Sequence, residues 1–408
     1  MRVKLRAMDE LLWMPQWPSQ FSLLTATAIM LIAGALAARI LSPLLRVPEI
    51  TAFLLCGLLL GPSGLSLISA DSVSGLAALA DLALGLVLFE LGRRVDPVWL
   101  MRERWTLITG LAQGFFTFLG LAGLLSALGV APVLALMAAA LGCASSPAIT
   151  LRVVQEARAE GQVTERLIHS VAINSLLGFV LFTISLQSLH IAQSAAWITT
   201  VAHPLYLLLG SSFLGWLASR SVSFVSQSLE KRPGLQQLLI LGFVALLVEA
   251  NELLKLSPFV SLLIFGISSR GYGVRGALHA PESGLTNYLV FAFLFVYLGA
   301  TLTIDFRADT LLLGLAFVAA RWMLLVTPSV LLCRFNGLSA RKGALWGSAL
   351  LPMSSVSIVL VSHAATLYPA FGTQLGNLIA SVLMITHTVG PLVTWWSLRL
   401  SGEARIDT

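Results

Sequence analysis

The stretch "CASSPAIT" at residues 143–150 decides the fold, because it puts a proline and two serines inside an otherwise apolar segment. A second stretch, "LLPMSSVS" at residues 350–357, has a similar composition. Proline removes a helical hydrogen bond and its ring clashes with the preceding turn, and serine hydroxyls can bond the backbone groups that a break sets free. We predict interrupted helices at both places, although two unrelated proline kinks would give the same local pattern. The prolines are Pro147 and Pro352, and the serines are Ser145, Ser146, Ser354 and Ser355.

The composition is that of a membrane protein. Hydrophobic residues make up 57% of the 408 positions and charged residues only 11%, whereas a soluble domain carries about 25% charge. A helix needs about 20 mostly apolar residues to cross a bilayer. Thirteen segments qualify, and we predict an all-α polytopic membrane protein. The segments lie near residues 21–40, 49–61, 73–92, 106–127, 131–151, 166–188, 196–218, 236–253, 257–269, 286–302, 310–332, 342–365 and 373–397.

Other classes of function lack their sequence signals. The net charge of +6 is low for a nucleic-acid-binding chain of this length. The three cysteines are far apart in sequence, with neither a disulfide framework nor metal-ligand spacing. We find no nucleophile–base spacing and no phosphate-binding loop, so we predict no enzyme activity, no cofactor and no metal site.

The basic residues indicate an orientation. Most of the 25 lysines and arginines fall in the loops that follow odd-numbered segments. The positive-inside rule then places these odd loops and the C-terminal tail (398–408) in the cytoplasm and the N-terminus outside. The basic tail at residues 1–20 is the one contradiction to this assignment.

Several local patterns occur twice in the transmembrane domain (21–397). Gly57 in "ITAFLLCGLLLG" matches Gly266 in "SPFVSLLIFGISSRG", 209 residues later. Gly92 matches Gly299 after 207 residues, and the two prolines match after 205. Each pair is seven spans apart, so the second copy is inverted in the membrane. Inverted repeats of this kind, here near 49–188 and 257–397, are typical of secondary transporters.

These motifs resemble a known family. "RVPEITAFLLCGLLLGPSGLSLI" (46–68), "LADLALGLVLFELGRRVD" (79–96), "ASSPAITLRVVQE" (144–156) and "LFVYLGATLTID" (294–305) are similar to motifs of the monovalent cation:proton antiporter superfamily, in the same order and spacing. The resemblance covers roughly residues 21–397. It implies 13 helices, a six-helix core domain, a dimerisation domain, and fifth and twelfth helices that are broken and cross near the ion site. It also implies a homodimer in a bacterial-type inner membrane that moves a small monovalent cation and protons across the lipid bilayer by an elevator-like motion.

The sixth segment departs from the family at "INS" (173–175). Members of the superfamily carry Asp-Asp or Asn-Asp there, and the second carboxylate binds the cation or protons in competition. Asn174 fits the first position, but Ser175 stands where the carboxylate is expected, and serine does not titrate in the physiological range. With Ser145, Ser146 and Ser354, the pair offers only neutral oxygen ligands.

Four ionisable residues in the segments are candidates for charge or proton transfer, since an ionisable group costs about 2.5 to 3.5 kcal/mol inside a membrane helix. The resemblance pairs Arg321 with a carboxylate on another core helix, and direct contact with substrate is the alternative. Glu90 precedes two arginines, so a salt bridge competes with a role as gate or relay. His363 and His387 could titrate near neutral pH, or they could be packing residues.

Two functions remain open from the sequence. The chain exchanges Na⁺ or K⁺ for protons, or carries the cation with altered proton coupling. Alternatively, it is a diverged member of the family that transports an anion or neutral solute, or acts as a sensor or scaffold without transport.

Overall fold

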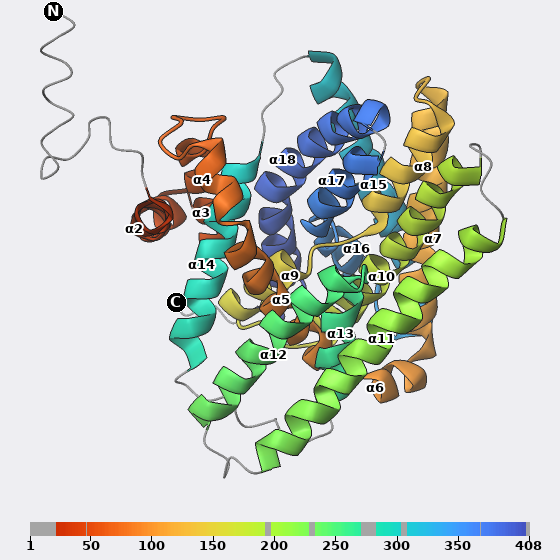
Figure 1. The fold of residues 1–408 in the computed structure, drawn as a ribbon. Coiled ribbons are helices and arrows are strands. Elements are labelled where there is room, and N and C mark those ends of the chain that lie inside the picture. Colours follow the sequence, from red (N-terminus) through yellow and green to blue (C-terminus); the bar gives the residue numbers. More distant parts are fainter. Residues whose placement is uncertain are drawn as a thin grey trace, which may run out of the picture.

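The computed structural model describes residues 22–45, 47–191, 197–227, 233–270, 283–302, 308–367 and 369–404. These residues are helical apart from their connections and one isolated β-bridge, as Figure 1 shows. The predicted N-terminal tail (1–20) and the last residues of the C-terminal tail (405–408) lie outside the described residues.

Each predicted segment is present as a helix or a pair of half-helices. The long or single helices are α2 (Leu23–Leu45), α3 (Glu49–Leu60), α5 (Ala77–Arg94), α7 (Arg104–Ala127), α10 (Gln162–Ile191), α11 (Trp197–Gln227), α12 (Pro233–Leu253), α13 (Pro258–Ser269), α14 (Ser283–Thr301), α15 (Ala308–Leu331) and α18 (Pro369–Leu400). The half-helices are α8 (Pro132–Cys143) with α9 (Pro147–Glu156), and α16 (Ala340–Ala349) with α17 (Val356–Leu367). Short connecting elements are α4 (Ala70–Gly75), α6 (Pro97–Arg102) and the 3-10 turn η2 (Arg334–Asn336).

Length and composition agree with a membrane protein. Six helices of the described residues are long and apolar enough to cross a bilayer, and four more are shorter but apolar. The prediction of an all-α polytopic membrane protein is therefore confirmed.

The two interrupted helices cross each other at their breaks. Ser145 and Met353 form an isolated antiparallel bridge. On either side of it, the N–H of Ser146 donates to the carbonyl oxygen of Pro352 at 2.8 Å, and the N–H of Ser354 donates to that of Ala144 at 3.1 Å. Neither break is a mere proline kink, because each chain leaves its helix and pairs with the other break. We call this element the crossing bridge.

The crossing bridge corrects the register of the repeat at the prolines. It pairs Ser145 with Met353, an offset of 208 (353 less 145), whereas matching the two prolines gave 205. Pro147 occupies the first turn of α9, where the missing N–H costs no helical bond. Pro352 instead lies in the extended linker before α17. The prolines therefore break their helices at different positions of the repeat.

Two glycine contacts reproduce the repeat in space. A Cβ atom built on Gly92 of α5 would lie 2.9 Å from the Cα of Gly266 in α13, and one built on Gly299 of α14 would lie 3.0 Å from the Cα of Gly57 in α3. Each added Cβ would also collide with the carbonyl three residues before the facing glycine, Leu263 or Leu54. Only glycine permits this approach of two backbones. The matched glycines of the sequence thus form two equivalent helix crossings, each joining one helix from either repeat.

The odd loops gather at one face of the molecule, which we call the odd-loop face. Arg152 contacts Glu49 at 2.8 Å, Arg270 contacts Asp96 at 2.8 Å, and Arg166 donates to the carbonyl oxygen of Asn336 at 2.8 Å. Each of these contacts joins two different odd loops or the helix ends beside them. This agrees with an alternating path of the thirteen segments.

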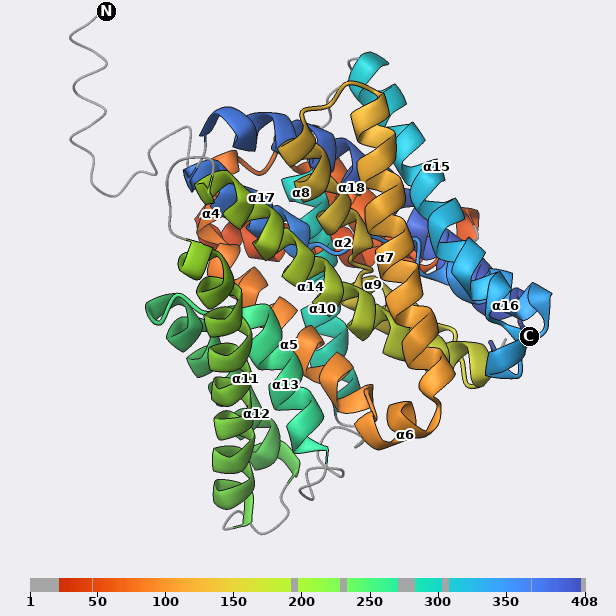
Figure 2. The same cartoon turned by 90° about the vertical axis from the view of Figure 1, so that its right-hand side faces the viewer.

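The C-terminal tail closes the same face. Both carboxylate oxygens of Glu403 accept hydrogen bonds from the first turn of α10, from the N–H groups of Val163 (2.9 Å) and Thr164 (2.8 Å). Figure 2 shows α11, α12 and α13 gathered on one side of the molecule and α15 and α16 on the other. The crossing bridge belongs to the interior between α10, α15 and α18, because its residues 144–146 and 353–355 are all buried.

Candidate functional site

Arg321 of α15 reaches the crossing bridge from the side of the half-helix C-termini. It is completely buried. Its Nε donates to the carbonyl oxygen of Gly142 at 2.6 Å, one terminal nitrogen to those of Leu350 (3.1 Å) and Leu351, and the other to the Ala144 carbonyl (3.2 Å) and the Ser145 hydroxyl (3.3 Å). A guanidinium has five N–H groups, so all of its donors are used.

These partners correct the prediction for Arg321. The carboxylate implied by the family resemblance is absent from its contacts among the described residues. In its place are backbone carbonyls at the ends of α8 and α16, where a helix carries a partial negative charge. The guanidinium therefore neutralises two half-helix C-termini at once and holds them together.

Asn174 and Ser175 approach the crossing bridge on α10. Ser175 is 2% exposed, and its hydroxyl donates to the carbonyl oxygen of Ser145 at 2.7 Å. Asn174 is fully buried, and neither its amide oxygen nor its amide nitrogen has a hydrogen-bond partner among the residues that the structure describes. A buried polar group without a partner costs about 1 to 3 kcal/mol. Such a group is retained at a cost to stability, which marks Asn174 as a candidate ligand.

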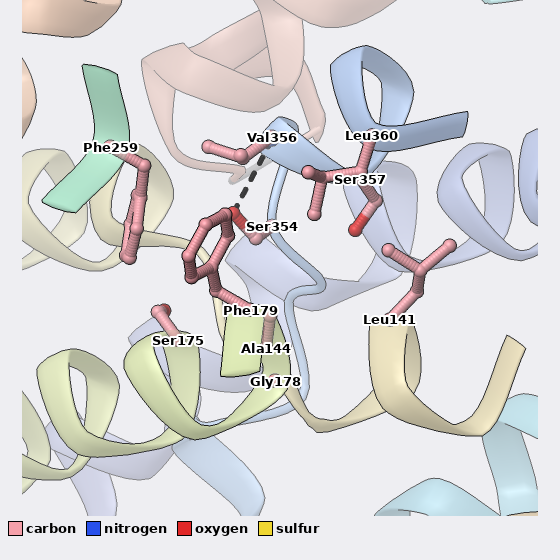
Figure 3. A pocket seen from close by; sticks show the side chains of 10 residues that line it. All are labelled: Leu141, Ala144, Ser175, Gly178, Phe179, Phe259, Ser354, Val356, Ser357 and Leu360. Atoms are coloured by element: carbon pink, nitrogen blue, oxygen red, sulfur yellow. Dashed lines mark hydrogen bonds between the residues drawn. The ribbon is translucent and has the colours of Figure 1, made fainter. Parts of the chain in front are cut away.

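A small cavity of about 10 Å³ lies against the crossing bridge, which is about the space that a single water molecule needs. Figure 3 shows Phe179 of α10 and Phe259 of α13 on one side of it and Leu141 and Leu360 on the other. Its walls are mostly apolar, and three serines contribute hydroxyl groups to the lining. They are Ser175, Ser354 and Ser357.

The remaining predicted serines also lie at the breaks. The Ser146 hydroxyl accepts from the N–H of Ile149 at 3.3 Å and so caps α9. The Ser354 hydroxyl accepts from the N–H of Val356 at 3.4 Å at the start of α17. The Ser355 hydroxyl is buried and has no hydrogen-bond partner within the described ranges. The cap of α9 and the start of α17 are therefore closed by the predicted serines, and one hydroxyl stays available.

The ionisable candidates separate in space. Glu90 lies near the end of α5 and forms an ion pair with Arg94 at 3.0 Å, one helical turn away, which supports the salt-bridge interpretation. The side chain of His363 lies outside the described residues. His387 of α18 is fully buried beside the crossing bridge, with its Nε2 3.2 Å from the carbonyl oxygen of Met353.

The cavity residues that sequence reasoning missed include Ser357, Phe179 and Phe259. Ser357 was visible in the quoted stretch as its last serine, and its buried hydroxyl has no partner among the described residues. The two phenylalanines have ring centroids 6.1 Å apart and come from α10 and α13. No spacing within one segment could have paired them. Within the described ranges, no three histidine, cysteine or carboxylate side chains come close enough to hold a metal ion.

Two carboxylates at the odd-loop face have shifted pKa values. Hydrogen bonding from the N–H of Trp99 lowers the pKa of Asp96 below its usual range. Burial opposes this shift, and Arg270 and the N–H of Val98 lower the pKa further. Burial raises the pKa of Glu156, the last residue of α9, to about 6, against a hydrogen bond from the N–H of Glu49. Asp96 caps α6 through the N–H groups of Val98 and Trp99, both at 3.0 Å.

Comparisons with known proteins agree with this architecture. The family model described as "Sodium/hydrogen exchanger, transmembrane" matches residues 28–399. A protein of Methanocaldococcus jannaschii named "Probable Na(+)/H(+) antiporter 3" is 24% identical over 370 residues, which cover 85% of this chain and 90% of that protein.

Two solved structures share the fold. Both are of the sodium proton antiporter MjNhaP1 from the same organism. One, determined at pH 8, has 19% identity and a TM-score of 0.65 over 93% of this chain and 95% of the other. An electron microscopy map has 18% identity and a TM-score of 0.70 over 95% and 100%.

Proposed function

The chain belongs to the sodium/hydrogen exchanger family, and on that premise we propose that it exchanges a small monovalent cation, Na⁺ or K⁺, for protons at the crossing bridge. The observation that carries the choice of a cation is the state of the polar groups there. Among the described side chains, Arg321 is the one cation at the bridge, and all its donors bind backbone carbonyls or the Ser145 hydroxyl. The amide oxygen of Asn174 accepts from no donor in the described part of the chain.

The proposed cation site uses neutral oxygen atoms. Hard cations prefer oxygen ligands, and the region offers the Asn174 amide oxygen with the hydroxyls of Ser175, Ser145 and Ser354. These side chains are at most 2% exposed. A cation that enters must exchange its water for these atoms, and the absence of a carboxylate among them makes its binding weaker than a charged site would allow.

An anion is the alternative, and one observation favours it. The N-terminal ends of α9 and α17 adjoin the crossing bridge, and helix N-termini attract negative charge. However, Arg321 has no donor left to bind an anion, and its charge already offsets the C-terminal ends of α8 and α16. This contact argues against an anion as the substrate.

Proton coupling requires a titratable group other than Ser175. Glu90 is engaged by Arg94, which argues against it. The neutral pair on α10 also predicts that coupling differs from that of exchangers with an aspartate in this place. We further propose a homodimer in a bacterial-type inner membrane with the odd-loop face in the cytoplasm, in agreement with the loop charges.

Proton flux in liposomes tests the proposal. Purified protein is reconstituted with an imposed pH gradient, and Na⁺, K⁺ and Li⁺ are added in turn at mildly acidic and mildly alkaline pH. We expect at least one cation to dissipate the gradient. Ser175→Asp should bind that cation at least about tenfold more tightly, because a charge-assisted contact is worth about 1.5 to 3 kcal/mol and 1.4 kcal/mol is tenfold.

The matched control is Ser74→Asp, which adds the same charge at an exposed position of α4 and should leave flux and affinity unchanged. If neither the wild type nor Ser175→Asp responds to any of the three cations, exchange at this site is wrong. Chloride and organic anions would then be tested on the same liposomes.

A further inference from the structure

Ser175 and His387 occupy equivalent places on the crossing bridge. The Ser175 hydroxyl binds the carbonyl oxygen of Ser145 at 2.7 Å, and the His387 Nε2 binds that of Met353 at 3.2 Å. Ser145 and Met353 are themselves the bridged pair. Their flanking residues make the two bridge hydrogen bonds, so their own carbonyls point away from the partner strand. One residue of α10 and one of α18 therefore bind the two outer edges of the bridge.

The glycine one turn later confirms the equivalence. A Cβ atom built on Gly178 would lie 3.1 Å from the backbone nitrogen of Ala144, and one built on Gly390 would lie 3.0 Å from the Cα of Pro352. Ala144 and Pro352 are the residues just before the bridged pair. Each helix thus has a polar residue that binds the carbonyl of a bridged residue. Three residues later, each helix has a glycine that packs against the residue just before that bridged residue. The offset is 212 for both (387 less 175, and 390 less 178).

His387 differs from Ser175 in that it can carry a proton. A carbonyl oxygen only accepts, so Nε2 must be the protonated nitrogen of the ring. Nδ1 then presents a lone pair, and it is buried without a hydrogen-bond partner among the described residues. The ring is fully buried, so the unpaired nitrogen does not belong to a mobile side chain at the protein surface. This lone pair is the atom site at which the ring can take up a proton.

Few ionisable groups surround His387. Helix α18 packs against α3, α8, α9, α15, α16 and α17. Arg321 of α15 is the cation at the bridge, where it contacts Leu351, two residues before Met353. These elements also supply other ionisable residues, which are Cys143 of α8, Glu49 and Cys56 of α3, Arg152 and Glu156 of α9, Arg341 and Lys342 of α16, and Asp309 of α15 and His363 of α17, of whose side chains nothing is described. Glu49, Arg152 and Glu156 contact one another at the odd-loop face. Among the described side chains, no carboxylate is found at the bridge to take the proton instead.

We propose that His387 carries the exchanged proton, on Nδ1, at the position of the second repeat that corresponds to Ser175 in the first. The proposal rests on the proposed cation exchange and names its coupling group. An imidazolium at one edge of the bridge repels a cation held by Asn174 and Ser175 at the other. Binding of one cation therefore releases one proton from Nδ1 to water, and the total charge of the site is unchanged.

The test measures Na⁺ and K⁺ affinity against pH by calorimetry on the purified protein. In the wild type, affinity should fall by up to tenfold per pH unit on the acidic side of the histidine titration. His387→Gln keeps an N–H donor for the Met353 carbonyl but cannot titrate, so its affinity should not vary with pH and proton flux should be lost. Thr388→Val, the next residue, whose hydroxyl binds only the Met384 carbonyl of its own helix, should behave as the wild type.

The outcomes separate the two proposals. If the wild type binds and exchanges a cation and His387→Gln keeps the same pH dependence, the coupling group is elsewhere and this inference is wrong, while cation exchange stands. If the wild type binds neither cation and shows no flux, the proposed function itself is wrong. If His387→Gln and His387→Asn both fail to fold, the pH dependence of cation affinity in the wild type is measured at several temperatures. The pKa that governs this affinity must shift strongly with temperature, as that of an imidazole does. A pKa that does not change with temperature would overturn the inference.

Discussion

Replacement of Arg321 by methionine should destabilise the protein severely while leaving its surface unchanged. Among the described residues, the substitution removes the donor of two buried carbonyls, those of Gly142 and Leu351. The carbonyls of Ala144 and Leu350 keep the N–H of Ser354 and the hydroxyl of Ser145 as donors. An unsatisfied buried acceptor costs about 1 to 3 kcal/mol. For the two carbonyls left without a donor, the loss is about 2 to 6 kcal/mol. A midpoint shift of about 2 °C per kcal/mol for a large domain corresponds to roughly 4 to 12 °C.

Thermal unfolding in detergent, followed by tryptophan fluorescence, measures this shift. Arg321→Lys should fall between the wild type and Arg321→Met, because lysine keeps the charge but has three donors and no planar fork. The control is Arg102→Met, at an exposed position at the end of α6, which should change the midpoint by less than about 1 °C, since surface substitutions stay within about 0.5 kcal/mol.

One result would refute the reasoning. If Arg321→Met unfolds at the same temperature as Arg102→Met, the guanidinium does not hold the half-helix ends together. A stable Arg321→Met protein with altered solute affinity would instead favour direct contact with substrate, the alternative left open by the sequence.

Two further predictions concern packing and pH. Gly92→Ala should cost about 1 to 3 kcal/mol in unfolding free energy, the usual cost of overpacking. Gly242→Ala, where an added Cβ has nothing within 4 Å among the described residues, should instead stabilise α12 by about 0.5 to 1 kcal/mol. Equal midpoints in the same unfolding assay would contradict the glycine argument. Asp96→Ala should cost about 0.5 to 2 kcal/mol at neutral pH through loss of its helix cap. Because the pKa of Asp96 is lowered in the folded protein, its ionised form stabilises above about pH 4, the ordinary range of aspartate, and that contribution is lost as the pH falls through the lower folded value. The difference between wild type and variant should thus shrink on acidification, and a difference that grows would overturn the assignment.

Much of the fold was predictable because its sequence signals either act within one segment or occur twice in the chain. Thirteen apolar segments, two breaks marked by proline and serine, and glycines repeated at near-constant offset all have a physical reason that acts within one segment. The sequence analysis used the glycines only to detect the repeat, and the structure shows that they also mark close approaches of two backbones. Gly92 and Gly266 form such a contact.

The site was less predictable because its contacts join residues without a sequence signature. The partners of Arg321 are backbone carbonyls, and any residue supplies a carbonyl. The register of the crossing bridge depends on which extended residues pair. The two prolines, which suggested an offset of 205, lie at different positions relative to the bridged pair. The equivalence of Ser175 and His387 left a faint trace in "INSLLG" and "ITHTVG", which share only the first residue and the final glycine.

The contact of Glu403 with α10 bears on biogenesis. The N–H groups of Val163 and Thr164 obtain their carboxylate partner only when a residue 240 and 239 positions later has been synthesised. Until then, the first turn of the helix that carries Asn174 relies on water or lipid headgroups for those bonds. Helix α10 is therefore inserted before the contact with Glu403 can form, and the whole second half of translation separates the two events. A ribosome stalled before residue 403 would hold a chain whose odd-loop face is still open to proteases at this turn.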